Sequence, residues 1–183
     1  MSQTCEPALG IGLNLWGMTE ATAIDIRRIP FTTADGKEAT LSDYDGQVLL
    51  IVNVASRCGL APQYEQLEEL KRKYGPRGFD VLAFPSNQFL QELSKMDDIL
   101  EYCSMTWGVT FPVFDKVRVN GKKAAPLYKE LTKAEDVDGK SGRVEWNFEK
   151  FLVLPDGQVK RFRPRMKPDD PAIVSVIEAH LPE

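Results

Sequence analysis

Histidine and cysteine are scarce in this chain of 183 residues, and their scarcity excludes several common kinds of catalytic site. The single histidine, His180, stands close to the C-terminal end, so a Ser-His-Asp or Cys-His site would have to be built on that residue. The three cysteines, Cys5, Cys58 and Cys103, are too far apart for the C-x-x-C spacing of zinc ribbons and redox dithiols. An odd number of cysteines indicates free thiols in a reducing compartment, of which one or more can be reactive.

Long apolar runs and an excess of basic residues are also absent. The chain has 23 Lys and Arg against 27 Asp and Glu, a formal net charge of −4, which disfavours a dedicated binder of nucleic acid or of an anionic membrane. No segment is long and apolar enough to span a bilayer, so we expect no stable membrane insertion. No basic region precedes the mildly apolar stretch 8–16, so we predict no signal peptide and expect a cytoplasmic protein.

The hydrophobic pattern divides the chain into an N-terminal extension, residues 1–22, and a single domain, residues 23–183. Glycines interrupt any periodicity in the extension, so we expect it to be poorly ordered. The domain begins with a predicted hairpin over 23–40, whose turn is marked by Asp35-Gly36. A nearly continuous aliphatic run over 48–55 predicts a central strand that is buried on both faces.

Further strands and helices alternate after this run. Strands are expected at 79–84, 110–114, 151–154 and 158–162, and helices after Pro62, over 95–105 and over 170–181. The order β-α-β-α and then β-β-α predicts an α/β fold with a central mixed β-sheet flanked by helices. This is the layout of a thioredoxin-like fold with an N-terminal β-hairpin.

Cys58 is the first candidate for chemistry, because it follows the buried strand and stands just ahead of a helix. The unpaired N–H groups at a helix N-terminus stabilise a thiolate, and Arg57 adds positive charge. The end of a central strand is also where open α/β sheets place their sites. A buried packing role is the alternative, since cysteine is a common core residue. Gly59 and the lack of apolar periodicity around Cys58 favour the functional interpretation.

Uncharged N–H donors gather in two other segments. Trp146 and Asn147 precede a predicted strand, and Asn87, Gln88 and Gln91 follow another. A core tryptophan beside an asparagine turn would explain the first segment equally well. A thiolate among neutral donors, with no histidine, suits attack on an O–O bond, because such donors stabilise the thiolate and the departing oxyanion without a titrating base. The product would be a sulfenic acid, with which a second thiol can condense.

Four segments resemble the signature of the glutathione peroxidase family, in its bacterial, cysteine-containing branch. They occur in the family's order at 53–59 (NVASRCG), 84–89 (FPSNQF), 107–112 (WGVTFP) and 146–151 (WNFEKF). The resemblance covers residues 23–182 and implies a thioredoxin-like fold and reduction of hydrogen peroxide and of organic or lipid hydroperoxides. It further implies no bound cofactor or metal, and thioredoxin or glutathione as the reducing co-substrate.

The resemblance also implies roles for individual residues. Cys58 matches the peroxidatic residue that attacks the peroxide, and Trp146 and Asn147 match the pair that hydrogen-bonds its thiolate. Cys103 has the spacing of a core residue on its predicted helix, yet it matches the resolving thiol of the cysteine branch. A disulfide needs the two Cα atoms within about 7 Å, so we expect helix 95–105 to unwind locally on oxidation.

Gln91 matches the family's catalytic glutamine in an altered loop. The loop before it is one residue shorter than in the family, and Leu93-Ser94 replaces the usual Pro-Gly. The alternatives that this change leaves open are Glu92, Asn87 and Gln88. Because this loop is altered, the chain could instead be a catalytically inactive thioredoxin-like binding module, which is an alternative to a peroxidase.

Two surface segments bear on partners. Five of the eight residues from Lys160 to Lys167 are basic, which indicates either a solvated edge or a docking face for an acidic reductant or a phospholipid head group. The loop over 135–143 is short for the family, whose tetrameric members carry a longer insertion, so we expect a monomer. The same pair of cysteines would also serve a redox sensor or thiol relay that passes oxidation to a partner protein.

Overall fold

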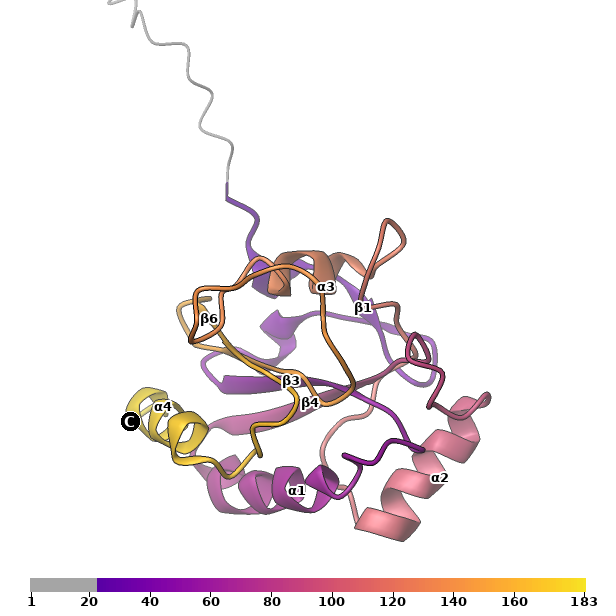
Figure 1. Cartoon of the computed structure of the whole chain (residues 1–183). Helices are drawn as coiled ribbons and strands as arrows, with labels where there is room; N and C mark the ends of the chain where they lie inside the picture. The colour runs from indigo at the N-terminus through magenta and orange to yellow at the C-terminus, as the bar shows by residue number, and fades with distance from the viewer. Residues whose placement is uncertain (1–22) are drawn as a thin grey trace, which may run out of the picture.

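The computed structural model describes residues 23–183, and its centre is a four-stranded mixed sheet in the order β4-β3-β5-β6 (Figure 1). The bounds of these strands are Val48–Val54 for β3, Phe79–Pro85 for β4, Lys150–Val153 for β5 and Val159–Phe162 for β6. β3 runs parallel to β4 and antiparallel to β5, and β6 runs antiparallel to β5. Cys5 and the expectation of a poorly ordered extension over 1–22 lie outside the described residues.

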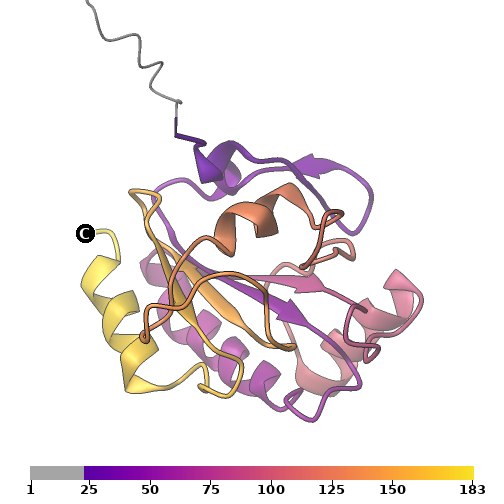
Figure 2. The same ribbon diagram turned by 45° about the horizontal axis from the view of Figure 1, so that its top comes forward.

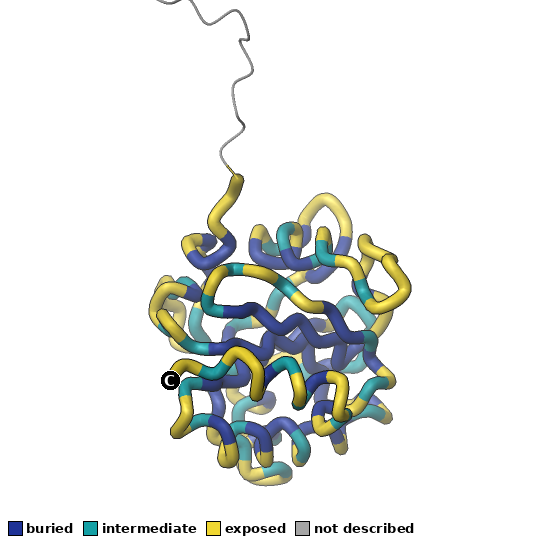
Figure 3. Tube along the Cα trace, turned by 90° about the vertical axis from the view of Figure 1, so that its left-hand side faces the viewer, coloured by how far each residue is buried: buried dark blue, intermediate teal, exposed yellow. Residues whose placement is uncertain are grey.

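The side chains of β3 alternate between two hydrophobic cores, one on each face of the sheet. All seven residues of β3 are buried, which confirms the strand that the aliphatic run predicted. Val48 and Leu50 belong to the core that the helices α1, α2 and α4 cover, whereas Leu49 and Ile51 belong to the core under α3 and the N-terminal hairpin. The helices span Gln63–Tyr74 (α1), Met96–Trp107 (α2), Pro126–Leu131 (α3) and Pro171–His180 (α4). Figure 2 shows the sheet between these two layers, and Figure 3 shows the buried residues concentrated along its strands.

The N-terminal hairpin is confirmed, but it is smaller than the sequence predicted. Its strands are β1, Phe31–Thr32, and β2, Glu38–Ala39, which pair antiparallel. Residues Ile26–Arg28, expected to extend the first strand, form one turn of 3-10 helix instead. The Asp25 carboxylate caps this turn by accepting the Arg27 N–H at 3.0 Å, and this local bond competes with strand pairing.

The prediction of a strand over 110–114 was wrong. This segment makes only two isolated β-bridges, Thr33 to Phe114 and Ala83 to Val113. Pro112 has no N–H to give to a ladder, which limits pairing at this place. The helix α3 was not predicted, since its six residues are too few to show a helical period. No helix within residues 23–183 is long and apolar enough to cross a membrane.

Candidate active site

Cys58 lies between the end of β3 and the start of α1, at the edge of the sheet where the parallel strands end. Its side chain is 6% exposed, and its Sγ accepts a hydrogen bond from the Leu60 N–H at 3.4 Å. A turn closed by the Ala61 N–H on the Cys58 carbonyl at 2.9 Å separates the cysteine from the first residue of α1. The sulfur therefore contacts an N–H of this turn, and not the helix end that the sequence suggested.

A pocket of about 540 Å³ opens at Cys58. It is lined by residues from four segments, namely Cys58, Gly59 and Leu60; Gln91; Glu145 and Trp146; and Arg163, Pro164 and Arg165. Three of the residues expected from the sequence, Cys58, Gln91 and Trp146, thus share one pocket, and Asn147 is fully buried next to it. Within residues 23–183, no three His, Cys, Asp or Glu side chains gather as metal ligands would.

Gln91 reaches this pocket in spite of the shortened loop. Leu90, just before it, has a left-handed backbone (φ 59°) and an 86% exposed side chain, so a tight turn directs Leu90 outward and Gln91 inward. The Gln91 carbonyl accepts the Arg57 N–H at 2.8 Å, which ties the loop to the residue before Cys58. The Gln91 side chain accepts a hydrogen bond from Nδ2 of Asn147 at 3.1 Å. Asn147 therefore orients Gln91 in this structure. Among the described residues, the hydrogen bond to Cys58 Sγ comes from the Leu60 N–H.

The three alternative residues of this loop make other contacts and do not line the pocket. Gln88 Oε1 accepts the two backbone N–H groups of segment 119–120, at 2.5 and 2.7 Å. Asn87 Oδ1 accepts the N–H of Glu92 at 3.1 Å, and Glu92 Oε1 accepts the N–H of Ser56 at 3.0 Å. These side chains hold the loop in its shape and fasten it to the turn that carries the cysteine.

Trp146 and Asn147 stand in a tight turn that is tied to the sheet. Phe148, the next residue, has a left-handed backbone (φ 63°), and its N–H donates to the Asn53 carbonyl at 2.6 Å. Nδ2 of Asn53 donates in turn to the Trp146 carbonyl at 3.0 Å. The Trp146 ring is 39% exposed and packs against Phe89 with ring centroids 5.0 Å apart. Sequence reasoning assigned no role to Asn53, although its place as the only polar side chain in an aliphatic run was the available signal.

Cys103 is absent from the pocket lining and lies in the core beneath α2. Its side chain is 2% exposed, and its Sγ donates a hydrogen bond to the Tyr64 hydroxyl at 3.5 Å. The pKa of the Cys103 thiol is raised to about 11, chiefly by burial and to a smaller extent by the Glu92 carboxylate, against the lowering effect of the Tyr64 hydrogen bond. Cys58 and Cys103 are both free thiols. A reaction between them therefore requires Cys103 to leave its buried position.

Lys150, another residue that sequence reasoning missed, lies behind the pocket wall. Its side chain is fully buried, and Nζ donates to the carbonyls of Phe148 at 2.6 Å and Pro164 at 3.0 Å. Gln63 Nε2 donates to the same Pro164 carbonyl at 2.9 Å. Burial lowers the pKa of Lys150 to about 7, against a smaller opposing effect of the Glu149 carboxylate. Lys150 joins the turn that carries Trp146 to the wall formed by 163–165.

We expect Lys150 to make the stability of the protein depend on pH. The pKa is about 7 in the folded chain and 10.5 in the unfolded chain, so the folded state is penalised at and below pH 7 and the penalty disappears as the pH rises toward 10.5. Relative to Lys150→Met, the unfolding free energy of the wild type should rise by about 1.5 kcal/mol from pH 7 to pH 8.5. Urea unfolding at the two pH values measures this rise. Lys160→Met, at an exposed position of β6, is the control, and an equal pH dependence in Lys150→Met and the wild type would contradict the prediction.

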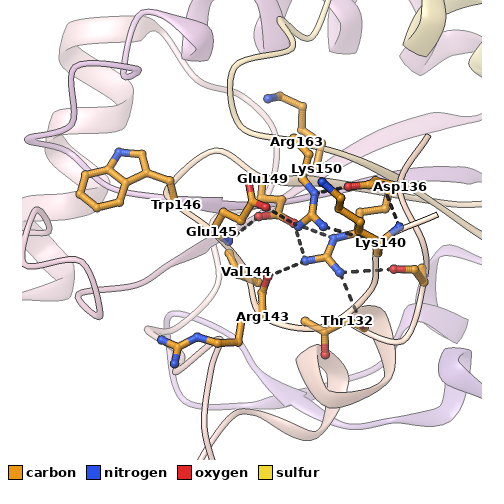
Figure 4. Close-up of polar contacts among 12 residues, drawn as sticks. Thr132, Asp136, Lys140, Arg143, Val144, Glu145, Trp146, Glu149, Lys150 and Arg163 are labelled. Atoms are coloured by element: carbon orange, nitrogen blue, oxygen red, sulfur yellow. Dashed lines mark hydrogen bonds and ion pairs between the residues drawn. The ribbon is translucent and has the colours of Figure 1, made fainter. Parts of the chain in front are cut away.

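A buried cluster of ion pairs fixes the wall beside Lys150 (Figure 4). The side chains of Arg161 and Glu149 have no exposed surface, and Nη2 and Oε1 are 2.6 Å apart. Arg163, which lines the pocket, contacts Glu149 at 2.9 Å and Asp136 at 2.6 Å. The Trp146 side chain points away from this cluster.

The expectation of a solvated edge over 160–167 therefore needs correction. Arg161 is an internal residue, and Arg163 is only partly exposed, because both pair with carboxylates. The basic residues of this segment that are exposed are Lys160, Arg165 and Lys167.

Comparisons with known proteins agree with the fold. The family model described as Glutathione peroxidase matches residues 26–132. The chain is 48% identical over 168 residues to the Thioredoxin/glutathione peroxidase BtuE of Escherichia coli K12, with 80% of this chain and 92% of the relative covered. It is also 48% identical over 143 residues to the Hydroperoxy fatty acid reductase gpx1 of Synechocystis sp., with 74% of this chain and 85% of the relative covered.

Among solved structures, the crystal structure of Trgpx in its apo form has a TM-score of 0.67 and 38% sequence identity to this chain. The alignment covers 87% of this chain and 100% of that one. It confirms the thioredoxin-like fold with a mixed sheet that the order of elements predicted. With a matching family model over more than half of its length and relatives close to half identical, the chain belongs to the glutathione peroxidase family.

Proposed function

We propose that the chain is a thiol peroxidase that reduces hydrogen peroxide and organic or lipid hydroperoxides at Cys58. The observation that carries the proposal is one pocket in which Cys58, held by the Leu60 N–H, meets Gln91 and Trp146. Relatives whose names describe a thioredoxin/glutathione peroxidase and a hydroperoxy fatty acid reductase support both the reaction and the range of substrates.

In the first step the Cys58 thiolate attacks one oxygen of the peroxide. An S–O bond forms, the O–O bond breaks, and the other oxygen leaves as an alcohol or water after taking up a proton. N–H donors facing the pocket stabilise the negative charge that moves from sulfur to the departing oxygen. We assign this role to the side chains of Gln91 and Trp146, with Asn147 as the residue that orients Gln91.

In the second step Cys103 condenses with the Cys58 sulfenic acid. A disulfide forms, and the sulfenic oxygen leaves as water with the proton of the Cys103 thiol. A thiol whose pKa is about 11 is almost entirely protonated at pH 7, so Cys103 attacks only after it leaves the core. Only two of the twelve residues of α2, Ile99 and Cys103, are buried, which makes local unwinding of this helix inexpensive.

A dithiol reductant such as thioredoxin then reduces the Cys58–Cys103 disulfide, and glutathione acting on the sulfenic acid is the second route. The two free thiols among the described residues suit a reducing compartment, and we propose the cytoplasm. The chain would work as a monomer with no bound cofactor.

A peroxidase assay that offers thioredoxin and glutathione in parallel tests the proposal. The wild type should consume hydrogen peroxide and a fatty acid hydroperoxide, and Cys58→Ser should lose the activity by several orders of magnitude, because the nucleophile is gone. Cys5→Ser is the matched control and should keep the activity. Full activity of Cys58→Ser would refute the proposal, and slow turnover with a stable mixed disulfide to one protein would indicate a thiol relay instead.

Gln91→Ala should lower kcat/KM for hydrogen peroxide about a hundredfold to a thousandfold, the effect of removing one donor to a developing oxyanion. Gln88→Ala is the control, since Gln88 holds segment 119–120 and does not face the pocket. It should lower the unfolding temperature and leave kcat/KM within about twofold of the wild type. A larger loss of kcat/KM in Gln88→Ala than in Gln91→Ala would assign the catalytic amide to the other glutamine.

A further inference from the structure

We propose that Tyr64 is the latch that keeps Cys103 inside the protein and thereby sets how long the Cys58 sulfenic acid lasts before the disulfide forms. The inference rests on the proposed function and adds a positioning residue that acts through Cys103. Tyr64 does not line the pocket, and within residues 23–183 the hydrogen bond to Cys58 Sγ comes from Leu60 and not from Tyr64.

The contacts of Tyr64 with α2 carry the proposal. Tyr64 stands on α1 with no exposed surface, and its hydroxyl accepts the hydrogen bond of the Cys103 thiol at 3.5 Å. Its ring stacks on Trp107, with centroids 6.1 Å apart and 27° between the planes. It also meets the Tyr102 ring at 6.4 Å. Tyr102 and Trp107 flank Cys103 on α2, so one side chain of α1 holds the resolving cysteine and both of its aromatic neighbours.

Tyr64 also contacts the turn next to the pocket. Its ring meets Phe148 edge-on, at 5.2 Å and 89°, and Phe148 closes the turn that carries Trp146 and Asn147. Tyr64 is therefore packed between the helix that must open and the turn that must stay in place. Ile99 and Cys103 are the two buried residues of α2, and Met96, Tyr102 and Trp107 pack partly buried against the same core. Since Tyr64 contacts Cys103, Tyr102 and Trp107, its contacts form a large part of what holds this helix closed.

The latch has a chemical consequence, since a closed α2 delays the resolving step. Burial keeps Cys103 protonated, so attack on the sulfenic acid waits for the opening of α2 and follows its equilibrium. Weakening the contacts with Tyr64 should raise the open population and shorten the lifetime of the sulfenic acid. Under this proposal the lifetime is set by α1 as well as by the helix that carries Cys103.

Alkylation of Cys103 in the reduced, full-length chain tests the latch directly. With Cys58→Ser in the background, N-ethylmaleimide modifies Cys103 as α2 opens, and peptide mass spectrometry follows this one site. Tyr64→Phe keeps the ring and removes the hydroxyl, so Cys103 should react about three- to tenfold faster, the factor expected from an ordinary hydrogen bond. Tyr102→Phe is the matched control, since its hydroxyl has no hydrogen bond within residues 23–183, and its rate should equal that of the wild type. Equal rates for Tyr64→Phe and the wild type would overturn the proposal.

A second variant approaches the same contact from α2. Trp107→Leu removes the stacked ring and leaves the Tyr64 hydroxyl in place, so it should also speed the alkylation of Cys103. A rate that stays at the wild-type value in both variants would show that other contacts hold α2 closed.

The lifetime of the Cys58 sulfenic acid is a second measurement, and it would not change if Tyr64 had only a structural role. One equivalent of hydrogen peroxide is added to the chain with both cysteines, and dimedone traps the remaining sulfenic acid at intervals after oxidation is complete. The lifetime should be shorter in Tyr64→Phe than in Tyr102→Phe or the wild type, and an unchanged or longer lifetime would overturn the latch. If no variant forms a sulfenic acid on Cys58, the proposed function fails, whereas the alkylation rates still decide the role of Tyr64.

Discussion

Cys103→Ser should abolish peroxide turnover driven by thioredoxin while Cys58 still reacts once with peroxide. Thioredoxin reduces disulfides, and without Cys103 the oxidised protein has no disulfide partner for Cys58 among the described residues. Steady-state turnover with thioredoxin, its reductase and NADPH should fall at least about a hundredfold, since the sulfenic acid has no resolving thiol. The initial consumption of one equivalent of peroxide should persist.

The same turnover assay with glutathione in place of thioredoxin distinguishes the two routes by which the oxidised protein can be reduced. Glutathione attacks the sulfenic acid of Cys58 directly, so turnover by this route should survive in Cys103→Ser. Cys5→Ser controls for the loss of a thiol elsewhere in the chain and should retain both activities. Thioredoxin-driven turnover at the wild-type rate in Cys103→Ser would exclude Cys103 as the resolving residue.

Glu149→Gln should destabilise the protein by about 3–5 kcal/mol, the usual effect of removing one partner of a buried ion pair. Glu149 and Arg161 are fully buried at 2.6 Å, and Arg163 contacts the same carboxylate at 2.9 Å. The substitution keeps the shape of the side chain and leaves the buried Arg161 guanidinium without its counter-charge. Urea unfolding of the variant and the wild type at pH 7 measures the loss.

The matched control is Glu130→Gln, which makes the same change in a partly exposed pair. Glu130 and Lys133 are 2.7 Å apart, so the distance is similar while the lysine is largely in solvent. Its effect should stay within about 1 kcal/mol, as for other surface pairs. Equal effects of the two substitutions would show that burial does not strengthen the pair of Glu149 and Arg161.

The parts of the fold that could be predicted are those with a strong local pattern. The aliphatic run of β3 and the apolar stripe of α2 mark these elements within a few residues of their true ends. The segment 110–114 has strand-forming residues and lies beside β4, but Pro112 has no N–H for a ladder, and the segment makes only isolated bridges. The six residues of α3 are too few to show a helical period.

The residues of the candidate site also divide into those that a local sequence segment indicates and those that only the folded structure reveals. Cys58, Gln91 and Trp146 stand in recognisable segments, and the structure places all three at one pocket. The parts played by Asn53, Lys150 and Tyr64 depend on contacts with residues distant in the sequence, which no local pattern shows. The turn at Leu90, which brings Gln91 inward, also depends on a left-handed backbone conformation that a leucine does not lead one to expect.

The antiparallel pairing of β5 with β3 has a consequence for synthesis of the chain on the ribosome. Because β5 runs opposite to β3, its first residues lie beside the last residues of β3, and this pairing brings Trp146 to Cys58 from 88 positions away. Until β5 has left the ribosome, the nascent chain carries Cys58 without the folded turn at Trp146 and Asn147 or the pocket wall at 163–165. Under the proposed function, a polypeptide stalled before residue 146 would expose Cys58 without its donors, and its reactivity toward peroxide would arise only as the C-terminal strands join the sheet.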